Sequence, residues 1–263
     1  MQTSSNTFQA KSTRQGLRPP SSSEKERQMS PPKMTPSPGE LARYIDHTLL
    51  RADATREELV TLCEEAREHG FFSVCVNLAN VRLARELLMG TDTCVCVVVG
   101  FPLGATSPQV KAFETHEALA AGAQEVDMVL NIGALKSGDF ELVSQDIQAV
   151  VDAARGKVVK VILECALLNE RQIAIASSLA KGAGAHFVKT STGFGPGGAK
   201  PEDLTLMRSI VGPDMGVKAS GGIRDYATAI AMLEAGANRL GCSASVAIVS
   251  DNTPESSASS DSY

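Results

Sequence analysis

Short apolar runs alternate with longer segments of helical periodicity through most of this chain. The apolar runs have lengths typical of buried strands and are rich in valine and isoleucine. We therefore predict eight strands, at residues 44–50, 71–77, 93–99, 125–131, 157–164, 186–191, 216–220 and 238–242.

Residues typical of helix ends lie between the predicted strands. Thr55 and Glu58 have the spacing of a capping box, and Ser107 before Pro108 fits an N-cap followed by a first-turn proline. Glycines that suit the C-terminal end of a helix are Gly70, Gly122 and Gly236. The segments between the strands are therefore predicted to be helices.

The strict alternation of strand and helix limits the choice of fold. Eight strand–helix units between residues 39 and 250 predict an α/β protein, a single (β/α)8 TIM barrel. A doubly wound open sheet shares the alternation, but it normally has a glycine fingerprint after its first strand, and residues 44–48 have none. Glycines gather instead around the last three strands, where barrels tend to bind phosphate.

Both ends of the chain lack the apolar periodicity of the barrel. Residues 1–38 contain six of the twelve prolines and eight serines, which predicts a disordered tail. An organellar transit segment is the alternative, but the tail has no clear amphipathic face. Residues 251–263 are Ser-rich and are predicted to be a flexible C-terminal tail ending in Tyr263.

Composition limits the classes of partner that this chain can bind. The net charge of -5 provides no basic field for a nucleic acid backbone, so a small-molecule substrate is expected. The six cysteines have neither zinc-ligand nor disulfide spacing and suit a reducing compartment. Without an apolar run of membrane-spanning length or a secretory signal, we expect a cytoplasmic protein with no membrane partner.

Four predicted strands carry charged residues that a buried strand does not need. Asp127, Lys160, Lys189 and Lys218 lie on consecutive strands, and because helices cover the outside of a barrel, their side chains are expected to point inward. Structural ion pairs are the alternative, for example Lys160 with Glu164 or Asp127 with a neighbouring lysine. Burying several unpaired charges would cost several kcal/mol, so their clustering favours a reactive site.

Such a cluster suits imine chemistry. A lysine beside a second ammonium group in a partly dry pocket loses its proton more readily, and its neutral amine attacks a carbonyl group. The resulting iminium group withdraws electrons from the adjacent carbon, whose proton must then be transferred. Asp127 and Lys218 fit that role.

Three glycine-containing turns after the last strands suggest a phosphate site. They lie at residues 191–193, 220–224 and 241–243, where backbone N–H groups could approach an anion. Each segment alone is equally consistent with an ordinary tight turn between a strand and a helix. Together they favour a phosphorylated substrate.

Residues 125–127, 187–194 and 217–224 resemble the signature segments of the deoxyribose-phosphate aldolase family, and residues 44–50 resemble its first strand. The resemblance runs from about residue 42 to residue 249. It implies a lyase that reversibly cleaves 2-deoxy-D-ribose 5-phosphate into D-glyceraldehyde 3-phosphate and acetaldehyde, without metal or organic cofactor. Its partners are thus a small phosphorylated sugar and acetaldehyde.

The same resemblance assigns roles to individual residues. Lys189 becomes the Schiff-base lysine, with Asp127 and Lys218 as the proton donor and acceptor pair. Lys160 becomes a further proton-relay candidate. Tyr263 becomes another, because some members end in a tyrosine that reaches the active site. The implied substrate-binding residues are Asp46, Thr48, Gly193, Gly221, Gly222, Gly241 and Ser243.

Two features depart from the family pattern. The N-terminal tail is not part of the family core, and Ala244 stands where some members have a second serine, which predicts weaker phosphate binding. Another phosphosugar barrel enzyme and a catalytically reduced aldolase-like scaffold stay open as alternatives. The sequence leaves the oligomeric state open, with a homodimer as one candidate.

Overall fold

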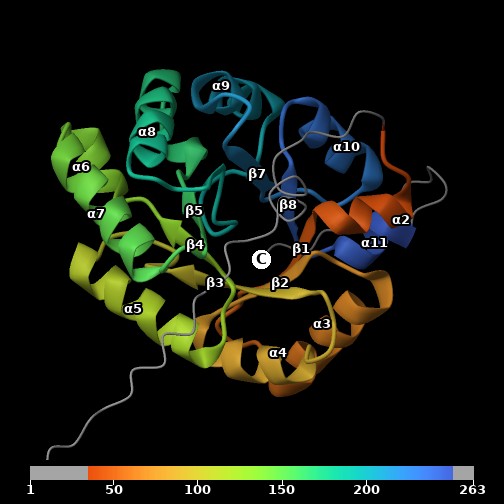
Figure 1. Cartoon of the computed structure of the whole chain (residues 1–263). Helices are drawn as coiled ribbons and strands as arrows, with labels where there is room; N and C mark the ends of the chain where they lie inside the picture. Colours follow the sequence, from red (N-terminus) through yellow and green to blue (C-terminus); the bar gives the residue numbers. More distant parts are fainter. Residues whose placement is uncertain (1–34, 251–263) are drawn as a thin grey trace, which may run out of the picture.

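The protein forms a closed barrel of eight parallel strands, ordered β1 to β8 around the ring (Figure 1). This computed structural model describes residues 35–250. The strands are β1 (Ile45–Leu49), β2 (Ser73–Val76), β3 (Cys94–Val99), β4 (Glu125–Val129), β5 (Val158–Ile162), β6 (Phe187–Lys189), β7 (Gly216–Ser220) and β8 (Arg239–Cys242). Because β1 pairs with β8, the predicted barrel is confirmed and the open sheet is excluded.

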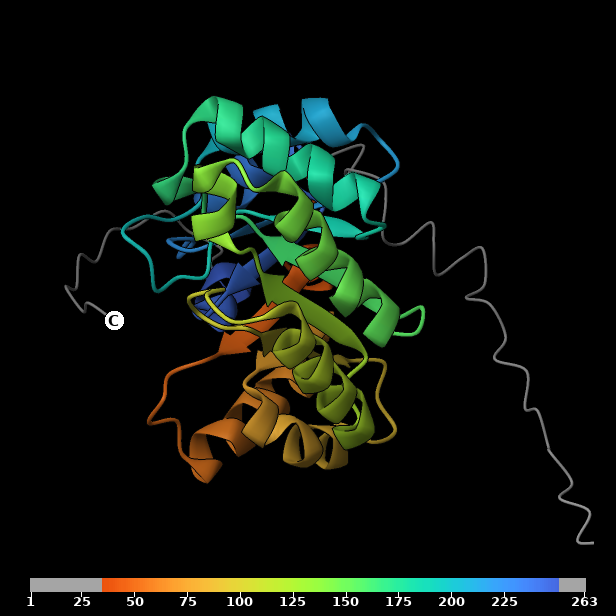
Figure 2. The same cartoon turned by 90° about the vertical axis from the view of Figure 1, so that its left-hand side faces the viewer.

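Helices surround the barrel on the outside, as the view along its axis and the view turned by 90° both show (Figures 1 and 2). The α-helices are α2 (Pro38–Leu41), α3 (Arg56–His69), α4 (Val81–Leu87), α5 (Pro108–Ala121), α6 (Ile132–Ser137), α7 (Phe140–Ala153), α8 (Glu170–Gly182), α9 (Pro201–Val211), α10 (Tyr226–Glu234) and α11 (Ser245–Ser250). Short 3₁₀ helices are η1 (Ala42–Tyr44), η2 (Leu78–Asn80) and η3 (Cys165–Leu167). Within residues 35–250, no helix is both long and apolar enough to cross a membrane.

The predicted helix ends are confirmed. Thr55 caps α3 in a capping box with Glu58, and Gly70 ends that helix in the left-handed conformation. Ser107 caps α5 ahead of Pro108. Gly122 is the C-cap of α5, and Gly236, with a φ of 112°, directly follows the C-cap of α10.

Residues 35–38, at the end of the predicted N-terminal tail, belong to the described structure. Ser37 already caps α2, and the Tyr226 hydroxyl donates a hydrogen bond to the Pro36 carbonyl at 2.7 Å. The predicted tails fall almost entirely on residues 1–34 and 251–263, which lie outside the described residues.

Alternation along each strand separates two packing environments. Val95, Val97 and Val99 belong to the large core that also contains helix residues such as Ala118. Cys96 and Val98 point the other way, into a small apolar cluster with Leu50, Cys75 and Phe101. A barrel interior is usually filled with branched apolar side chains. Here many of the other inward positions carry charges.

Candidate active site

Asp127 lies at the centre of a charge cluster inside the barrel. Its Oδ1 accepts a hydrogen bond from Lys160 at 2.7 Å, and its Oδ2 accepts from both Lys218 at 2.8 Å and Lys189 at 2.9 Å. Strand register explains the meeting, because Asp127 is paired with Lys160 across β4 and β5, and Lys189 with Lys218 across β6 and β7. The four residues singled out from the sequence are therefore together.

Three further charged residues complete this central charge cluster. Arg239 Nη2 lies 2.6 Å from Asp46 and 2.7 Å from Glu125. Glu125 also binds Lys160 at 2.7 Å, while Asp46 binds Lys218 and accepts from the Ser73 hydroxyl. The cluster consists of Asp46, Glu125, Asp127, Lys160, Lys189, Lys218 and Arg239, all of them buried.

Sequence reasoning missed part of this cluster. Arg239 was not singled out, although a charged residue in the apolar strand 238–242 is the same signal that marked Lys189. Glu125, two positions before Asp127 and so on the same strand face, was not singled out either. The alternative pairing of Lys160 with Glu164 is wrong, because β5 ends at Ile162 and the Glu164 carboxylate binds Thr192 instead.

Opposite charges dominate the electrostatics of the cluster. Burial opposes ionisation of Asp127, but the ammonium groups of Lys160, Lys189 and Lys218 hold the pKa of its carboxyl group well below the ordinary value. Burial likewise disfavours the charged form of Lys218, yet Asp127 and Asp46 raise its pKa above the ordinary value. The second ammonium expected beside Lys189 is thus a firmly protonated Lys218, which shares Oδ2 of Asp127 with it.

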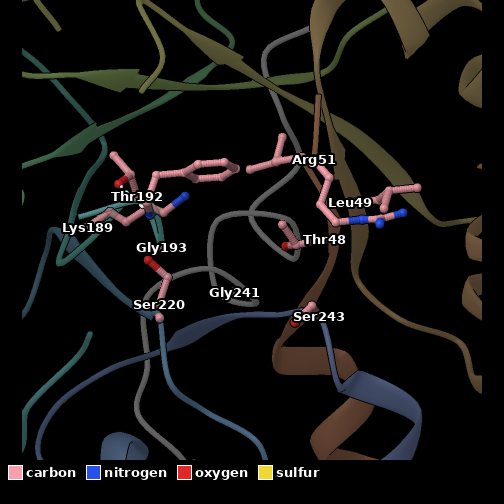
Figure 3. Close-up of a pocket in the computed structure, with 12 residues that line it drawn as sticks. Thr48, Leu49, Arg51, Lys189, Thr192, Gly193, Ser220, Gly241 and Ser243 are labelled. Carbon is pink, nitrogen blue, oxygen red and sulfur yellow. Dashed lines mark hydrogen bonds between the residues drawn. The ribbon is translucent and has the colours of Figure 1, made fainter. Parts of the chain in front are cut away.

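A pocket of about 240 Å³ meets the cluster at Lys189, and Figure 3 shows the residues that line it. Among the described residues, Lys189 is the one member of the central charge cluster that lines it. Five other residues proposed from the resemblance also line it, namely Thr48, Gly193, Gly221, Gly241 and Ser243. Thr192 and Ser220, which lie in two of the predicted phosphate-site turns, also line it. The remaining walls come from Leu49, Leu50, Arg51 and Phe194, which the sequence did not single out as binding residues.

Several proposed site residues lie elsewhere. Asp46 and Lys160 lie among the buried charges rather than in the pocket wall, and Gly222 follows the lining residue Gly221 without being part of the lining. Gly241 is a close-packed position, because a Cβ there would lie 3.0 Å from Ser220 Cβ and 3.1 Å from Lys218 Cε. Tyr263 lies outside the described residues.

Potential metal ligands also meet inside the barrel. Cys75, Cys96 and Asp127 bring one ligand atom each within 4.8 Å of one another, and Asp46, Cys96 and Glu125 do the same. The carboxylates of both groups already bind ammonium or guanidinium groups. A cation at either place would have to compete with these side chains.

Comparison with known proteins identifies the family. Residues 41–249 match the DeoC/LacD family aldolase profile. The chain is 61% identical over 212 residues to the deoxyribose-phosphate aldolase of Alkaliphilus oremlandii (80% of this chain, 96% of that protein) and 59% identical over 217 residues to that of Geobacillus sp. (82% and 97%).

Solved structures agree with this match. A crystal structure of a putative deoxyribose-phosphate aldolase from Coccidioides immitis superposes with a TM-score of 0.81 at 40% identity, covering 87% of this chain and 93% of that one. The tetrameric enzyme from Aeropyrum pernix gives a TM-score of 0.74 at 37% identity, covering 81% and 91%. With its barrel, its buried lysines and these relatives, the chain belongs to the DeoC/LacD family of aldolases.

Proposed function

We propose that this aldolase reversibly cleaves 2-deoxy-D-ribose 5-phosphate into D-glyceraldehyde 3-phosphate and acetaldehyde through a Schiff base on Lys189. The observation that carries the proposal is the position of Lys189, which lines the pocket while bound at 2.9 Å to the buried Asp127. The relatives named deoxyribose-phosphate aldolase support the choice of substrate.

Charge balance supports Lys189 as the nucleophile. The central charge cluster contains three carboxylates and four cationic groups, so it has one positive charge in excess. Release of one proton makes the cluster neutral. We assign the nucleophile to Lys189, because it lines the pocket, while Lys160 and Lys218 are each held charged by two or more carboxylates and Arg239 stays protonated.

The proposed reaction begins when the neutral amine of Lys189 adds to C1 of the open-chain sugar and water is lost. The iminium group then withdraws the electron pair of the C2–C3 bond while the C3 hydroxyl loses its proton. D-Glyceraldehyde 3-phosphate leaves and an enamine remains. Protonation of the enamine carbon and hydrolysis of the imine release acetaldehyde and restore the amine.

Asp127 and Lys218 are the proposed proton-transfer pair. Asp127 Oδ2 accepts hydrogen bonds from both Lys189 and Lys218. A proton is proposed to move between Asp127 and Lys218 over their hydrogen bond of 2.8 Å. Lys160, hydrogen-bonded to the other carboxylate oxygen, is proposed to keep Asp127 ionised and to relay protons. Asp46 is proposed to act through Lys218, which it binds, and Thr48 to orient the substrate hydroxyls from the pocket wall.

Borohydride trapping tests the proposed function. Incubation with acetaldehyde and sodium borohydride is expected to add one ethyl group to Lys189, and the purified enzyme is expected to cleave 2-deoxyribose 5-phosphate. Cleavage without any labelled lysine would refute the imine route. Labelling without cleavage would leave an imine-forming aldolase with a different substrate.

The proposed phosphate end of the pocket consists of Gly193, Gly221, Gly241 and Ser243. Ser243→Asp would place a negative charge where the phosphate binds. Its KM for 2-deoxyribose 5-phosphate is expected to rise roughly tenfold or more, because the new carboxylate repels the phosphate at this exposed position of the pocket wall, while its KM for 2-deoxyribose changes little. Ser243→Asn is the uncharged control of similar volume. Equal effects on both sugars would place the phosphate elsewhere.

The exposed apolar side chains and the free thiols support two further inferences, on assembly and on cellular location. We infer a homodimer, supported by large exposed apolar side chains such as Leu103 and Phe113, and light scattering in solution would test it. We infer a cytoplasmic location, supported by six cysteines that are all free, and fractionation of cells that express the protein would test it.

A further inference from the structure

Glu164 follows the end of β5 in an unusual backbone conformation. Its φ is 57°, in the left-handed region, which only one other described non-glycine residue, Arg155, adopts. This conformation costs an ordinary residue roughly 1 kcal/mol or more, so other contacts must hold it. The side chain is 3% exposed, which means that a carboxyl group is kept inside the protein at this turn.

The contacts of Glu164 lead to the pocket wall. Its Oε2 accepts hydrogen bonds from the backbone N–H of Thr192, at 3.3 Å, and from the Thr192 hydroxyl. The same hydroxyl accepts the backbone N–H of Phe194 at 3.0 Å. Thr192, Gly193 and Phe194 all line the pocket that holds Lys189 (Figure 3). One carboxylate therefore fixes the first turn of the loop between β6 and α9.

The next part of the loop packs directly against the same carboxyl group. A Cβ at Gly195 would lie 2.8 Å from Glu164 Cδ, so any side chain at that position would push on the carboxyl group. Further on, Ala199 N–H donates to the Gly221 carbonyl at 3.0 Å, which ties the end of the loop to another turn of the pocket. The loop is thus held between Glu164 at one end and Gly221 at the other.

Electrostatics rules out a direct attraction between Glu164 and an anionic ligand. A carboxylate beneath an anion-binding loop repels phosphate, and Oε1 of Glu164 is buried with no hydrogen-bond partner among residues 35–250. Whatever Glu164 contributes to phosphate binding must therefore be geometric. Its hydrogen bond with the Thr192 N–H fixes the backbone just before Gly193. Gly193 has a φ of 87°, in the left-handed region, and lines the pocket.

We propose that Glu164 is a positioning residue that shapes the phosphate side of the pocket through Thr192, and so sets the preference of the enzyme for phosphorylated over unphosphorylated sugars. The inference rests on the proposed function. It predicts that a change at Glu164 affects recognition of the phosphate while leaving the chemistry at Lys189 intact.

The test compares kcat/KM for 2-deoxyribose 5-phosphate with kcat/KM for 2-deoxyribose. In Glu164→Ala the ratio of the two is expected to fall about tenfold or more, through a higher KM for the phosphorylated sugar, because a buried charge-assisted hydrogen bond is lost. Glu164→Gln keeps an acceptor oxygen for both Thr192 donors and is expected to stay within about threefold of the wild type. Trapping of acetaldehyde on Lys189 is expected at the wild-type level in both variants.

Gly195→Ala provides an independent arm, since its new methyl group pushes on Glu164 without removing any hydrogen-bonding group. Gly195→Ala is expected to lower the ratio of kcat/KM for the phosphorylated sugar to kcat/KM for 2-deoxyribose. If Glu164→Ala does not fold, this variant alone tests the role of Glu164. Gly182→Ala is the matched control, because a Cβ there meets nothing within 4 Å. An unchanged ratio in Gly195→Ala, or equal losses with both sugars, would overturn the role of Glu164. A wild type without activity on the phosphorylated sugar would overturn the proposed function as well.

Discussion

Lys189→Ala is expected to lower the rate of 2-deoxyribose 5-phosphate cleavage by at least roughly 10⁴-fold, since the variant has no amine in the pocket to form an imine. Lys189→Arg is expected to be as inactive. A guanidinium group stays protonated at neutral pH and cannot attack a carbonyl carbon. The assay is steady-state cleavage, together with loss of borohydride labelling by acetaldehyde.

The fold is expected to survive both changes. Asp127 keeps Lys160 and Lys218 as partners when Lys189 is removed, so no buried carboxylate is left unpaired. Lys157→Arg is a suitable control, because Lys157 is exposed and precedes β5, at the end of the barrel away from the pocket. Activity within tenfold of the wild type in either Lys189 variant would refute the imine mechanism.

Asp127→Asn is expected to combine a large loss of rate with a large loss of stability. The rate is expected to fall by roughly 10² to 10⁴, as when a group for proton transfer is removed. The amide also leaves three buried ammonium groups without their shared counter-charge, which costs roughly 3–5 kcal/mol. Thermal unfolding is therefore expected roughly 10 °C lower than in the wild type.

The stability loss has a predicted pH dependence. The folded protein holds the pKa of Asp127 well below its ordinary value, so this stabilisation is present above about pH 4, the unfolded value, and is lost as the pH falls. The gap in stability between the wild type and Asp127→Asn should thus narrow in acid. Asp152→Asn, on the exposed side of α7, is the control. An equal gap at pH 3 and pH 7 would show that ionisation of Asp127 does not stabilise the fold.

Periodicity predicted the fold and the inward-facing charges, because a strand shows its two faces in the sequence. It did not predict which charges would meet around the ring. Arg239 binds Asp46 only because β8 closes on β1, and the two residues are 193 positions apart in the chain. No local pattern encodes that contact.

The pocket walls were harder to predict for a different reason. Glu164 was taken as part of a strand that continued to residue 164, whereas β5 stops at Ile162 and the backbone then turns into the left-handed region. Apolar alternation contains no information on such a turn in a non-glycine residue. The contact with Thr192 depends on that turn and so stayed hidden.

The central charge cluster divides unevenly between the two halves of the barrel. Its three carboxylates all lie on β1 and β4, and its four cationic groups lie on β5, β6, β7 and β8. Within the cluster, β1–β4 thus carry only negative charges and β5–β8 only positive ones. Separated from the other half, each would leave its share of these buried charges without partners, at a cost of several kcal/mol. The central charge cluster therefore links the two halves of the barrel, because each half carries the counter-charges of the other.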